Sequence, residues 1–169
     1  VEISKALRRI GWAAAVYEYI GAYRTRVRSK NFVGKGEFFE PYDSFRFMFE
    51  DTSDDDDVIM ANLTSLGDAF RRDWKRILAA DAFFMNTDRH MRNFGVIRSS
   101  KTGDVLRLAP NFDNNQAYTA NPGGFSANML RLFVRSADAE DRENLKLLAG
   151  TCEGSKYLAA ACQAYARLC

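Results

Sequence analysis

The sequence predicts an α+β fold in which helices dominate and the strands form short antiparallel hairpins. Apolar residues recur every three to four positions in several long segments, which is typical of amphipathic helices. Other short segments have strand-like composition and turn residues between them, which indicates hairpins. A length of 169 residues suits one compact core, and 47% hydrophobic with 27% charged residues is typical of a globular protein.

The N-terminal part is predicted to hold one helix and one hairpin. Val1–Ile10 places three aliphatic side chains on one helical face, and Gly11 ends the helix. Ala14–Ala22 and Thr25–Phe32 have the composition of strands, and we expect them to pair about a turn near Gly21. A Gly-Lys-Gly sequence then opens a connecting region.

The middle of the chain contains an acidic run and the longest periodic segment. Asp51–Asp57 lacks the alternating carboxylates of a calcium loop, so we expect a solvated loop. Gly67–Met85 is predicted to be a core helix, with Arg71, Arg72, Lys75 and Arg76 off its apolar face. Asp81 falls near that face, where a carboxylate needs a partner.

A second hairpin and three helices are predicted after this helix. The strands of the hairpin are Phe94–Ile97 and Val105–Leu108, joined by the turn sequence SSKTGD. Helical patterns follow at Ser126–Val134, Ala137–Leu148 and Glu153–Leu168. Asp138 and Ser155 stand at plausible helix starts.

The cysteines and the hydropathy pattern favour a cytoplasmic protein. Cys152, Cys162 and Cys169 are an odd number without a CxxC pair, so we expect free thiols in a reducing compartment. The sequence has no apolar run of membrane-spanning length and no secretory signal, so no membrane partner is expected. A net charge of +2 does not indicate nucleic acid.

The second hairpin brings two candidate metal ligands together. Asn93 lies just before its first strand, and Asp113 lies shortly after its second. Because the start of one antiparallel strand adjoins the end of the next, these residues should meet at one end of the hairpin. Amide and carboxylate oxygens of this kind suit Mg²⁺ that is bound jointly by protein and phosphate groups.

Asp88 is the candidate general base. It lies in the loop that leaves the long helix, five residues before Asn93. A carboxylate at this place can accept the proton of an incoming hydroxyl while a metal neutralises charge on the transferred phosphoryl group. The spacing Asp-x-x-x-x-Asn equals that of the protein-kinase catalytic loop. Taken alone, each of these residues could be an ordinary loop or capping residue.

These motifs resemble a known family. Asn86–Gly95 (NTDRHMRNFG) followed by Leu108–Asn114 (LAPNFDN) resembles the catalytic core of the HipA-like serine/threonine kinases, and more distantly that of phosphatidylinositol kinases. The resemblance implies a mostly helical C-lobe over residues 34–169 and a remnant of the β-rich N-lobe over residues 1–33. It also implies a bacterial toxin–antitoxin setting, with a protein substrate and an antitoxin-like partner.

The resemblance also assigns roles to individual residues. It implies that Asp88 is the catalytic base, that Asn93 and Asp113 bind Mg²⁺ and the nucleotide ATP, and that Asp81 ties the helix to the loop. Arg89 and His90 would brace the catalytic loop or meet phosphate. Glu2 would be the helix-C acid that normally pairs with a lysine. Apart from the resemblance, Tyr118 and Phe125 flank the loop after Asp113 and could line a substrate groove.

The sequence departs from the kinase pattern in two places. Asp113 is followed by two asparagines rather than Phe-Gly, and no glycine-rich phosphate loop or strand lysine precedes Val1. We therefore expect the isolated chain to be inactive and the full-length protein to be a kinase. The alternatives are a pseudokinase or interaction module, a lipid kinase, and a metal-dependent hydrolase of phosphate esters.

Overall fold

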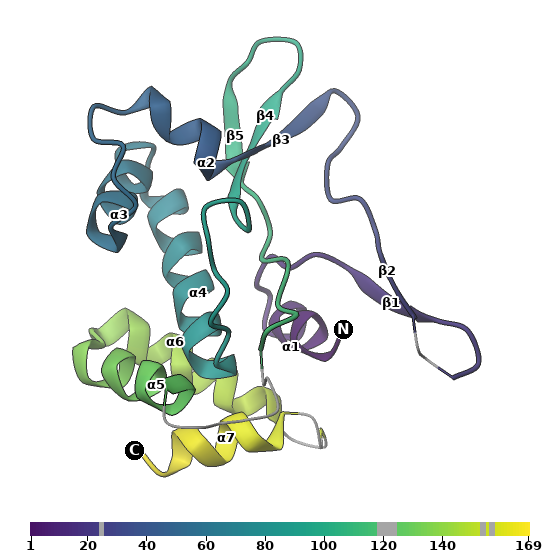
Figure 1. The fold of residues 1–169 in the computed structure, drawn as a ribbon, viewed down its shortest axis with the longest axis vertical. Coiled ribbons are helices and arrows are strands. Elements are labelled where there is room, and N and C mark those ends of the chain that lie inside the picture. The colour runs from purple at the N-terminus through teal and green to yellow at the C-terminus, as the bar shows by residue number, and fades with distance from the viewer. Residues whose placement is uncertain (24–25, 118–124, 153–154, 156–157) are drawn as a thin grey trace.

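The fold is α+β, with two small antiparallel sheets and a larger set of helices (Figure 1). The computed structural model describes residues 1–23, 26–117, 125–152, 155 and 158–169. Helix α4 (Asp68–Phe84) runs through the middle of the molecule, and the other helices and the second sheet are arranged around it (Figure 1). The predicted fold class is confirmed.

The N-terminal helix and hairpin form as predicted, but with shorter strands. Helix α1 spans Glu2–Arg9 and is followed by Gly11 at φ 79°. Strand β1 (Tyr17–Ile20) pairs antiparallel with β2 (Arg26–Ser29) as a separate two-stranded sheet. Gly21 ends β1 at φ 83°, a backbone conformation that glycine adopts without steric cost.

The second hairpin is confirmed, but it belongs to a three-stranded sheet. Strand β4 (Gly95–Ser99) lies between β5 (Val105–Leu108) and β3 (Glu37–Pro41), and both pairings are antiparallel. We expected only a connecting region where β3 lies. Strand β3 is stabilised by its pairing with β4, which includes an ion pair of 2.7 Å between Glu40 of β3 and Arg98 of β4.

The segment from β3 to α4 contains more helix than predicted. After β3 come the short helix α2 (Tyr42–Phe45), a 3₁₀ turn (Arg46–Met48) and helix α3 (Asp56–Ser65). Residues 51–55 of the acidic run are irregular, as predicted, but the last two aspartates form the first turn of α3. Acidic residues stabilise a helix N-terminus through its dipole, which explains why the run starts a helix.

Three helices follow the second hairpin, near the predicted positions. Helix α5 spans Phe125–Ser136, α6 spans Ala139–Ala149 and runs into a 3₁₀ turn (Gly150–Cys152), and α7 spans Ala159–Ala166. Asp138 caps α6 by accepting a hydrogen bond of 2.9 Å from the backbone N–H of Asp141. The expectation that Ser155 starts the last helix is wrong, because α7 begins after Leu158.

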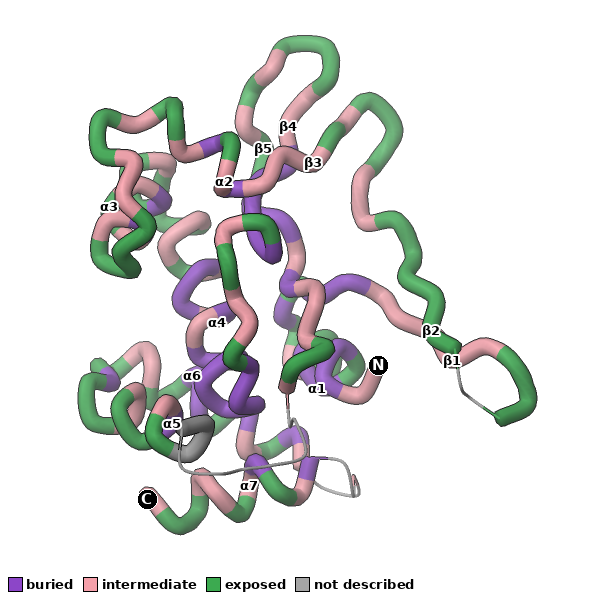
Figure 2. Tube along the Cα trace, in the orientation of Figure 1, coloured by how far each residue is buried: buried purple, intermediate pink, exposed green. Residues whose placement is uncertain are grey.

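Two hydrophobic clusters pack on α4. One contains side chains of α1, α4, α5, α6 and α7, including Leu7, Phe83, Leu130, Leu145 and Leu148. The other lies between α2, α3, α4 and the three-stranded sheet, including Tyr42, Phe45, Leu63, Trp74 and Val96. Figure 2 shows the buried positions along α4. Each such side chain contributes about 1.5 to 3 kcal/mol on burial. Helix α1 thus shares a hydrophobic cluster with the C-terminal helices. The predicted boundary between an N-lobe remnant (residues 1–33) and a C-lobe (residues 34–169) stays a prediction.

Lys75 corrects one detail of the predicted helix. We placed it off the apolar face, yet its side chain is only 8% exposed. Its ammonium lies 2.5 Å from Asp138, 3.2 Å from Asp141 and 3.7 Å from Glu140, which ties α4 to α6. The bond from Lys75 lowers the pKa of Asp138 to about 2, whereas burial raises the pKa of Asp141.

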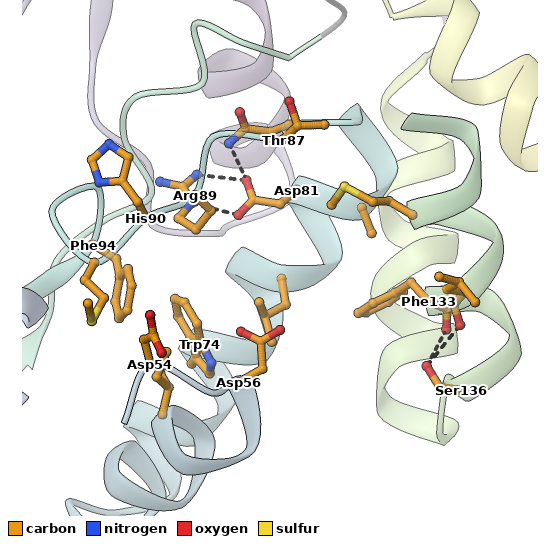
Figure 3. A pocket seen from close by; sticks show the side chains of 17 residues that line it. Asp54, Asp56, Trp74, Asp81, Thr87, Arg89, His90, Phe94, Phe133 and Ser136 are labelled. Carbon is orange, nitrogen blue, oxygen red and sulfur yellow. Dashed lines mark hydrogen bonds and ion pairs between the residues drawn. The ribbon is translucent and has the colours of Figure 1, made fainter. Parts of the chain in front are cut away.

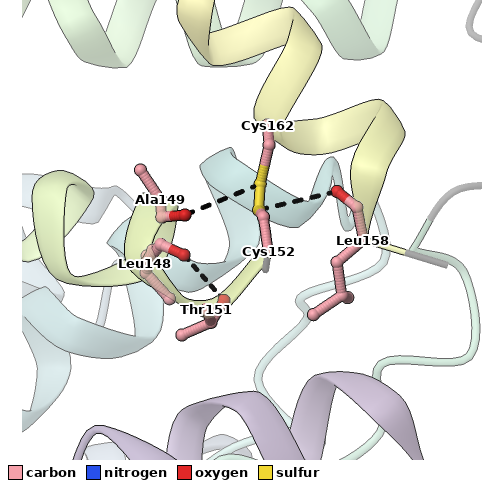
Figure 4. Close-up of a disulfide and its surroundings, with 6 residues drawn as sticks. All are labelled: Leu148, Ala149, Thr151, Cys152, Leu158 and Cys162. Atoms are coloured by element: carbon pink, nitrogen blue, oxygen red, sulfur yellow. Dashed lines mark hydrogen bonds between the residues drawn. A yellow bond between two sulfur atoms is a disulfide. The ribbon is translucent and has the colours of Figure 1, made fainter. Parts of the chain in front are cut away.

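The prediction of three free thiols is wrong for two cysteines. A disulfide joins Cys152 to Cys162, whose Cα atoms lie 6.3 Å apart, and it connects the 3₁₀ turn to α7 (Figure 4). The two residues are ten positions apart and meet because the chain turns back after α6. Cys169 is a free thiol, as predicted, and it is exposed. Within the described ranges, no helix combines the length and apolarity needed to cross a membrane.

Candidate active site

The candidate catalytic loop begins where α4 ends. Met85 adopts a left-handed backbone at φ 55°, which terminates the helix and turns the chain. The backbone N–H of Asn86 then donates to the carbonyl of Asp81 at 2.8 Å, and the Asn86 amide donates to the Asp81 carboxylate at 2.8 Å. These bonds hold the start of the loop against the last turn of the helix.

Arg89 is the centre of the hydrogen-bond network. Its Nε and Nη2 donate to the two carboxylate oxygens of Asp81 at 2.7 and 2.8 Å, in a bidentate ion pair. Asp81 is 3% exposed, so this pair lies inside the protein and supplies the partner that its position required. The guanidinium also donates to the carbonyls of Asn93 at 2.7 Å and Phe112 at 2.8 Å, and to Oδ1 of Asn114 at 3.0 Å.

These five bonds use all five N–H groups of the guanidinium. Arg89 therefore contacts the helix, the loop and the segment around Asp113 at the same time. Of the two roles expected for it, the observed contacts are those of a bracing residue. A phosphate contact would require it to break one of them.

The hairpin brings the segments that contain Asn93 and Asp113 to the same end, as expected. Nη1 of Arg89 bonds to both the Asn93 and the Phe112 carbonyls, so the two segments lie side by side. The next backbone pair along the hairpin is Ala109 N–H to Gly95 carbonyl at 2.8 Å. Gly95 is required here, because a Cβ atom would lie 2.2 Å from the carbonyl oxygen of Glu40 in β3.

Asn93 is buried and oriented by its own loop. Its side-chain amide donates to the carbonyl of Asp88 at 2.9 Å, and its backbone N–H donates to the carbonyl of His90 at 2.8 Å. Since the amide nitrogen is held, the position of Oδ1 is fixed. In the part of the chain that the structure describes, Oδ1 has no hydrogen-bond donor and is available as a ligand.

Asp113 has a strained backbone and an uncommitted carboxylate. Its φ of 54° is in the left-handed region, which costs a non-glycine residue about 1 kcal/mol or more. The backbone N–H donates to the hydroxyl of Tyr17 in β1 at 3.1 Å, and the neighbouring Asn111 forms backbone bonds with residues 13 and 15. Among the described residues, no group bonds to the carboxylate of Asp113.

The oxygen donors of Asn93 and Asp113 fit a magnesium ion. Both are hard ligands, and the contacts of Arg89 hold the backbone at Asn93 beside the backbone at Phe112, next to Asp113. Across the described ranges, no three His, Cys, Asp or Glu side chains gather into a metal cluster. The two oxygens would therefore be the protein's share of the coordination sphere, and phosphate and water would supply the rest.

Asp88 and His90 lie at the surface of the same loop. Asp88 is half-buried, and within the described residues its carboxylate forms no hydrogen bond or ion pair. His90 is exposed, and its Nδ1 accepts a bond of 3.2 Å from the backbone N–H of Arg92. A free carboxylate on an anchored loop has the freedom to accept a proton from a substrate hydroxyl.

One predicted residue, Glu2, is not brought into this network. The carboxylate of Glu2 lies 3.2 Å from the ammonium of Lys5 on the same helix. Tyr118 lies outside the described residues, and Phe125 begins α5. The structure adds Tyr17 and Asn114, which the sequence did not single out. Their contacts link distant segments, so no local pattern marks them.

Two cavities flank the catalytic loop and the Asp113 segment. One, of about 260 Å³, is lined by α1, β1, β2 and Asp113–Asn115. The other, of about 570 Å³, lies between the loop and helices α3, α4 and α5 (Figure 3). Asp113 therefore lines the smaller cavity. Thr87 and Arg89, which are the chain neighbours of Asp88, line the larger one.

Comparison with known proteins supports a kinase-like fold. No family model and no curated protein matches the chain. Among solved structures, the chain is similar to the crystal structure of a Helicobacter pylori proinflammatory kinase, CtkA, with a TM-score of 0.59. The similarity covers 99% of this chain and 86% of that chain at 13% sequence identity, so it shows the kinase-like fold alone.

Proposed function

We propose that this chain carries the catalytic base and magnesium ligands of a HipA-like kinase, which transfers the γ-phosphoryl group of ATP to a protein Ser or Thr hydroxyl. One observation supports this most strongly. Arg89 joins the catalytic loop to the Asp113 segment, and among the described residues the carboxylates of Asp88 and Asp113 have no partner. Unpaired carboxylates beside a buried, fully bonded guanidinium are groups that a ligand or substrate is expected to engage.

The contacts around the loop support the following proposed roles. Asn93 and Asp113 would hold Mg²⁺, which when bound neutralises charge on the phosphates of ATP. Asp88 would accept the proton of the attacking hydroxyl. Arg89 is a positioning residue, because it acts through the loop rather than on the substrate. The cavity of about 260 Å³ beside Asp113 is the proposed side of entry for the nucleotide phosphates.

The activity is proposed for the full-length protein. The proposed activity requires a glycine-rich phosphate loop and a strand lysine, neither of which the 169 residues contain in the kinase arrangement. Glu2 would pair with that lysine by exchanging its present partner, Lys5. A bacterial cytoplasm and an antitoxin-like partner are proposed from the family resemblance.

A phosphoryl-transfer assay with γ-labelled ATP tests this proposal on the full-length protein. We expect Asp88→Asn to reduce transfer to protein at least about 100-fold while Mg–ATP binding remains. Asp57→Asn is the matched control, since Asp57 is exposed on α3 and lines neither cavity. Undiminished transfer in Asp88→Asn would refute the role of this residue.

The same assay separates the alternatives. A protein that neither binds Mg–ATP nor transfers phosphate is an interaction module or pseudokinase. Transfer to lipid but not to protein indicates a lipid kinase. Release of phosphate from esters without nucleotide indicates a hydrolase.

A further inference from the structure

The cavity of about 570 Å³ lies beside the proposed catalytic base. Residues on both sides of Asp88, among them Thr87, Arg89 and His90, line it, and the opposite walls come from α3, α4 and α5 (Figure 3). Its volume is in the range of ligand-binding pockets. It does not include Asp113, so the proposed nucleotide site does not account for it.

The walls of this cavity are apolar with an acidic edge. Trp74, Phe94 and Phe133 contribute aromatic surface, and Leu132 of α5 is 63% exposed at the rim. Asp54 and Asp56 also line the cavity, and in the described chain no Lys or Arg forms an ion pair with either. Burial and the neighbouring carboxylates raise the pKa of Asp56, so a cation beside it would be stabilised.

Two buried polar atoms in the wall have no partner. Nε1 of Trp74 and Oδ1 of Asn86 belong to residues that are each 1% exposed, and neither atom has a hydrogen bond in the described structure. Figure 3 shows the indole of Trp74 between Asp54 and Asp56 in this view. Asn86 Oδ1 cannot rotate away, because Nδ2 of the same amide is bonded to Asp81. Each unpaired buried group costs about 1 to 3 kcal/mol.

The unpaired donor and acceptor lie about three helical turns apart, so they match backbone groups of different residues in an extended chain. A backbone carbonyl can accept from Trp74 Nε1, and a backbone N–H can donate to Asn86 Oδ1. The apolar wall suits an aliphatic or aromatic side chain, and the two aspartates suit Lys or Arg. The shape, the charge and the unpaired atoms therefore agree on one kind of occupant.

We propose that this cavity binds an extended peptide segment of the protein substrate that carries a Lys or Arg close to an apolar side chain. The segment would place its Ser or Thr hydroxyl at Asp88. This inference rests on the proposed kinase function and adds the substrate class. It makes Asp54, Asp56 and Trp74 specificity-determining residues.

Fluorescence anisotropy with labelled peptides tests this inference on the full-length protein without ATP. The probe is an eleven-residue peptide with a central Ser, one Arg and one Leu. Two control peptides have the same sequence except for one residue: the first has Glu in place of Arg, and the second has Ser in place of Leu. We expect the Arg–Leu peptide to bind at least about fivefold tighter than either control peptide. The double variant Asp54→Asn/Asp56→Asn should remove the preference for Arg over Glu.

Matched variants separate a local site from general effects. Asp57→Asn removes the same charge from the same helix outside the cavity and should leave the preference intact. Leu132→Ser should weaken the Arg–Leu peptide, whereas Leu147→Ser, on α6 and 40% exposed, should not. Trp74→Phe should weaken peptide binding, because it deletes the unpaired buried donor while an aromatic ring remains in the wall.

Three results would overturn the inference. They are equal binding of the three peptides, an unchanged preference in the double aspartate variant, and an equal loss in Asp57→Asn. Mg–ATP binding on the same samples keeps the two proposals apart. If ATP binds and the peptides do not discriminate, the peptide site is wrong and the kinase function stands. If ATP does not bind, the kinase function fails whatever the peptides do.

Discussion

Replacing Arg89 with Met removes five hydrogen bonds and one buried ion pair in a single step. The Asp81 carboxylate, 3% exposed, would keep only the amide of Asn86 as a side-chain donor. Removing one partner of a buried charge pair typically costs about 3 to 5 kcal/mol, because the other charge stays buried without compensation. That is a large part of the roughly 5 to 15 kcal/mol that stabilises an ordinary domain.

Urea unfolding followed by circular dichroism measures this loss. The variant Asp81→Asn/Arg89→Met no longer buries a charge, so we expect it to recover about 1 to 3 kcal/mol relative to Arg89→Met alone. Phosphoryl transfer should stay low in both, since neither holds the loop against the Asp113 segment. Urea unfolding therefore measures the free-energy cost of burying the unpaired Asp81 charge, and phosphoryl transfer measures the loss of loop positioning by Arg89.

Arg92→Met is the matched control in the same loop. Arg92 has one ion pair, at 3.0 Å to Asp43, and its side chain is 76% exposed. We expect its removal to change stability by about 1 kcal/mol at most. If Arg89→Met cost no more than Arg92→Met, the reasoning that Arg89 holds the site together would be refuted.

Further predictions concern the elements around the site. Gly95→Ala should destabilise the fold by about 1 to 3 kcal/mol and lower activity, because its Cβ would meet the backbone of β3; unchanged unfolding would contradict this. Asp113→Ala should be less stable than Asp113→Asn by about 1 kcal/mol, since Asn tolerates the left-handed backbone; equal melting temperatures would exclude this strain. The contact of Lys75 with Asp138 lowers the pKa of that carboxyl from 3.8 to about 2, so its contribution is present above about pH 4 and is lost as the pH falls toward 2. Stability in this window should therefore fall less steeply in Lys75→Met.

The parts of the fold that depend on local patterns could be predicted. Helix α4 has a long apolar period, and the β4–β5 hairpin has turn residues between two short strands. Strand β3 could not be predicted, because its strand state depends on pairing with β4, more than fifty residues away. The start of α3 could not be predicted, because it lies within an acidic run whose composition is also typical of a loop.

The candidate site divides in the same way. Asp88, Asn93 and Asp113 stand in motifs, and the hairpin argument correctly placed the loop beside the Asp113 segment. The large cavity could not be predicted, since it is assembled from three helices and a loop. The disulfide between Cys152 and Cys162 was also missed, because only the turn after α6 brings the two thiols together.

The most direct test of the proposed magnesium–nucleotide site is a calorimetric titration of the full-length protein with ATP, with and without Mg²⁺. We expect Mg²⁺-dependent binding in the wild type, its loss in Asp113→Asn, and its retention in Asp88→Asn. Asp104→Asn, in the β4–β5 turn, is the control and should bind as the wild type does. ATP binding that is unaffected by Mg²⁺ and by Asp113→Asn would contradict the proposed site.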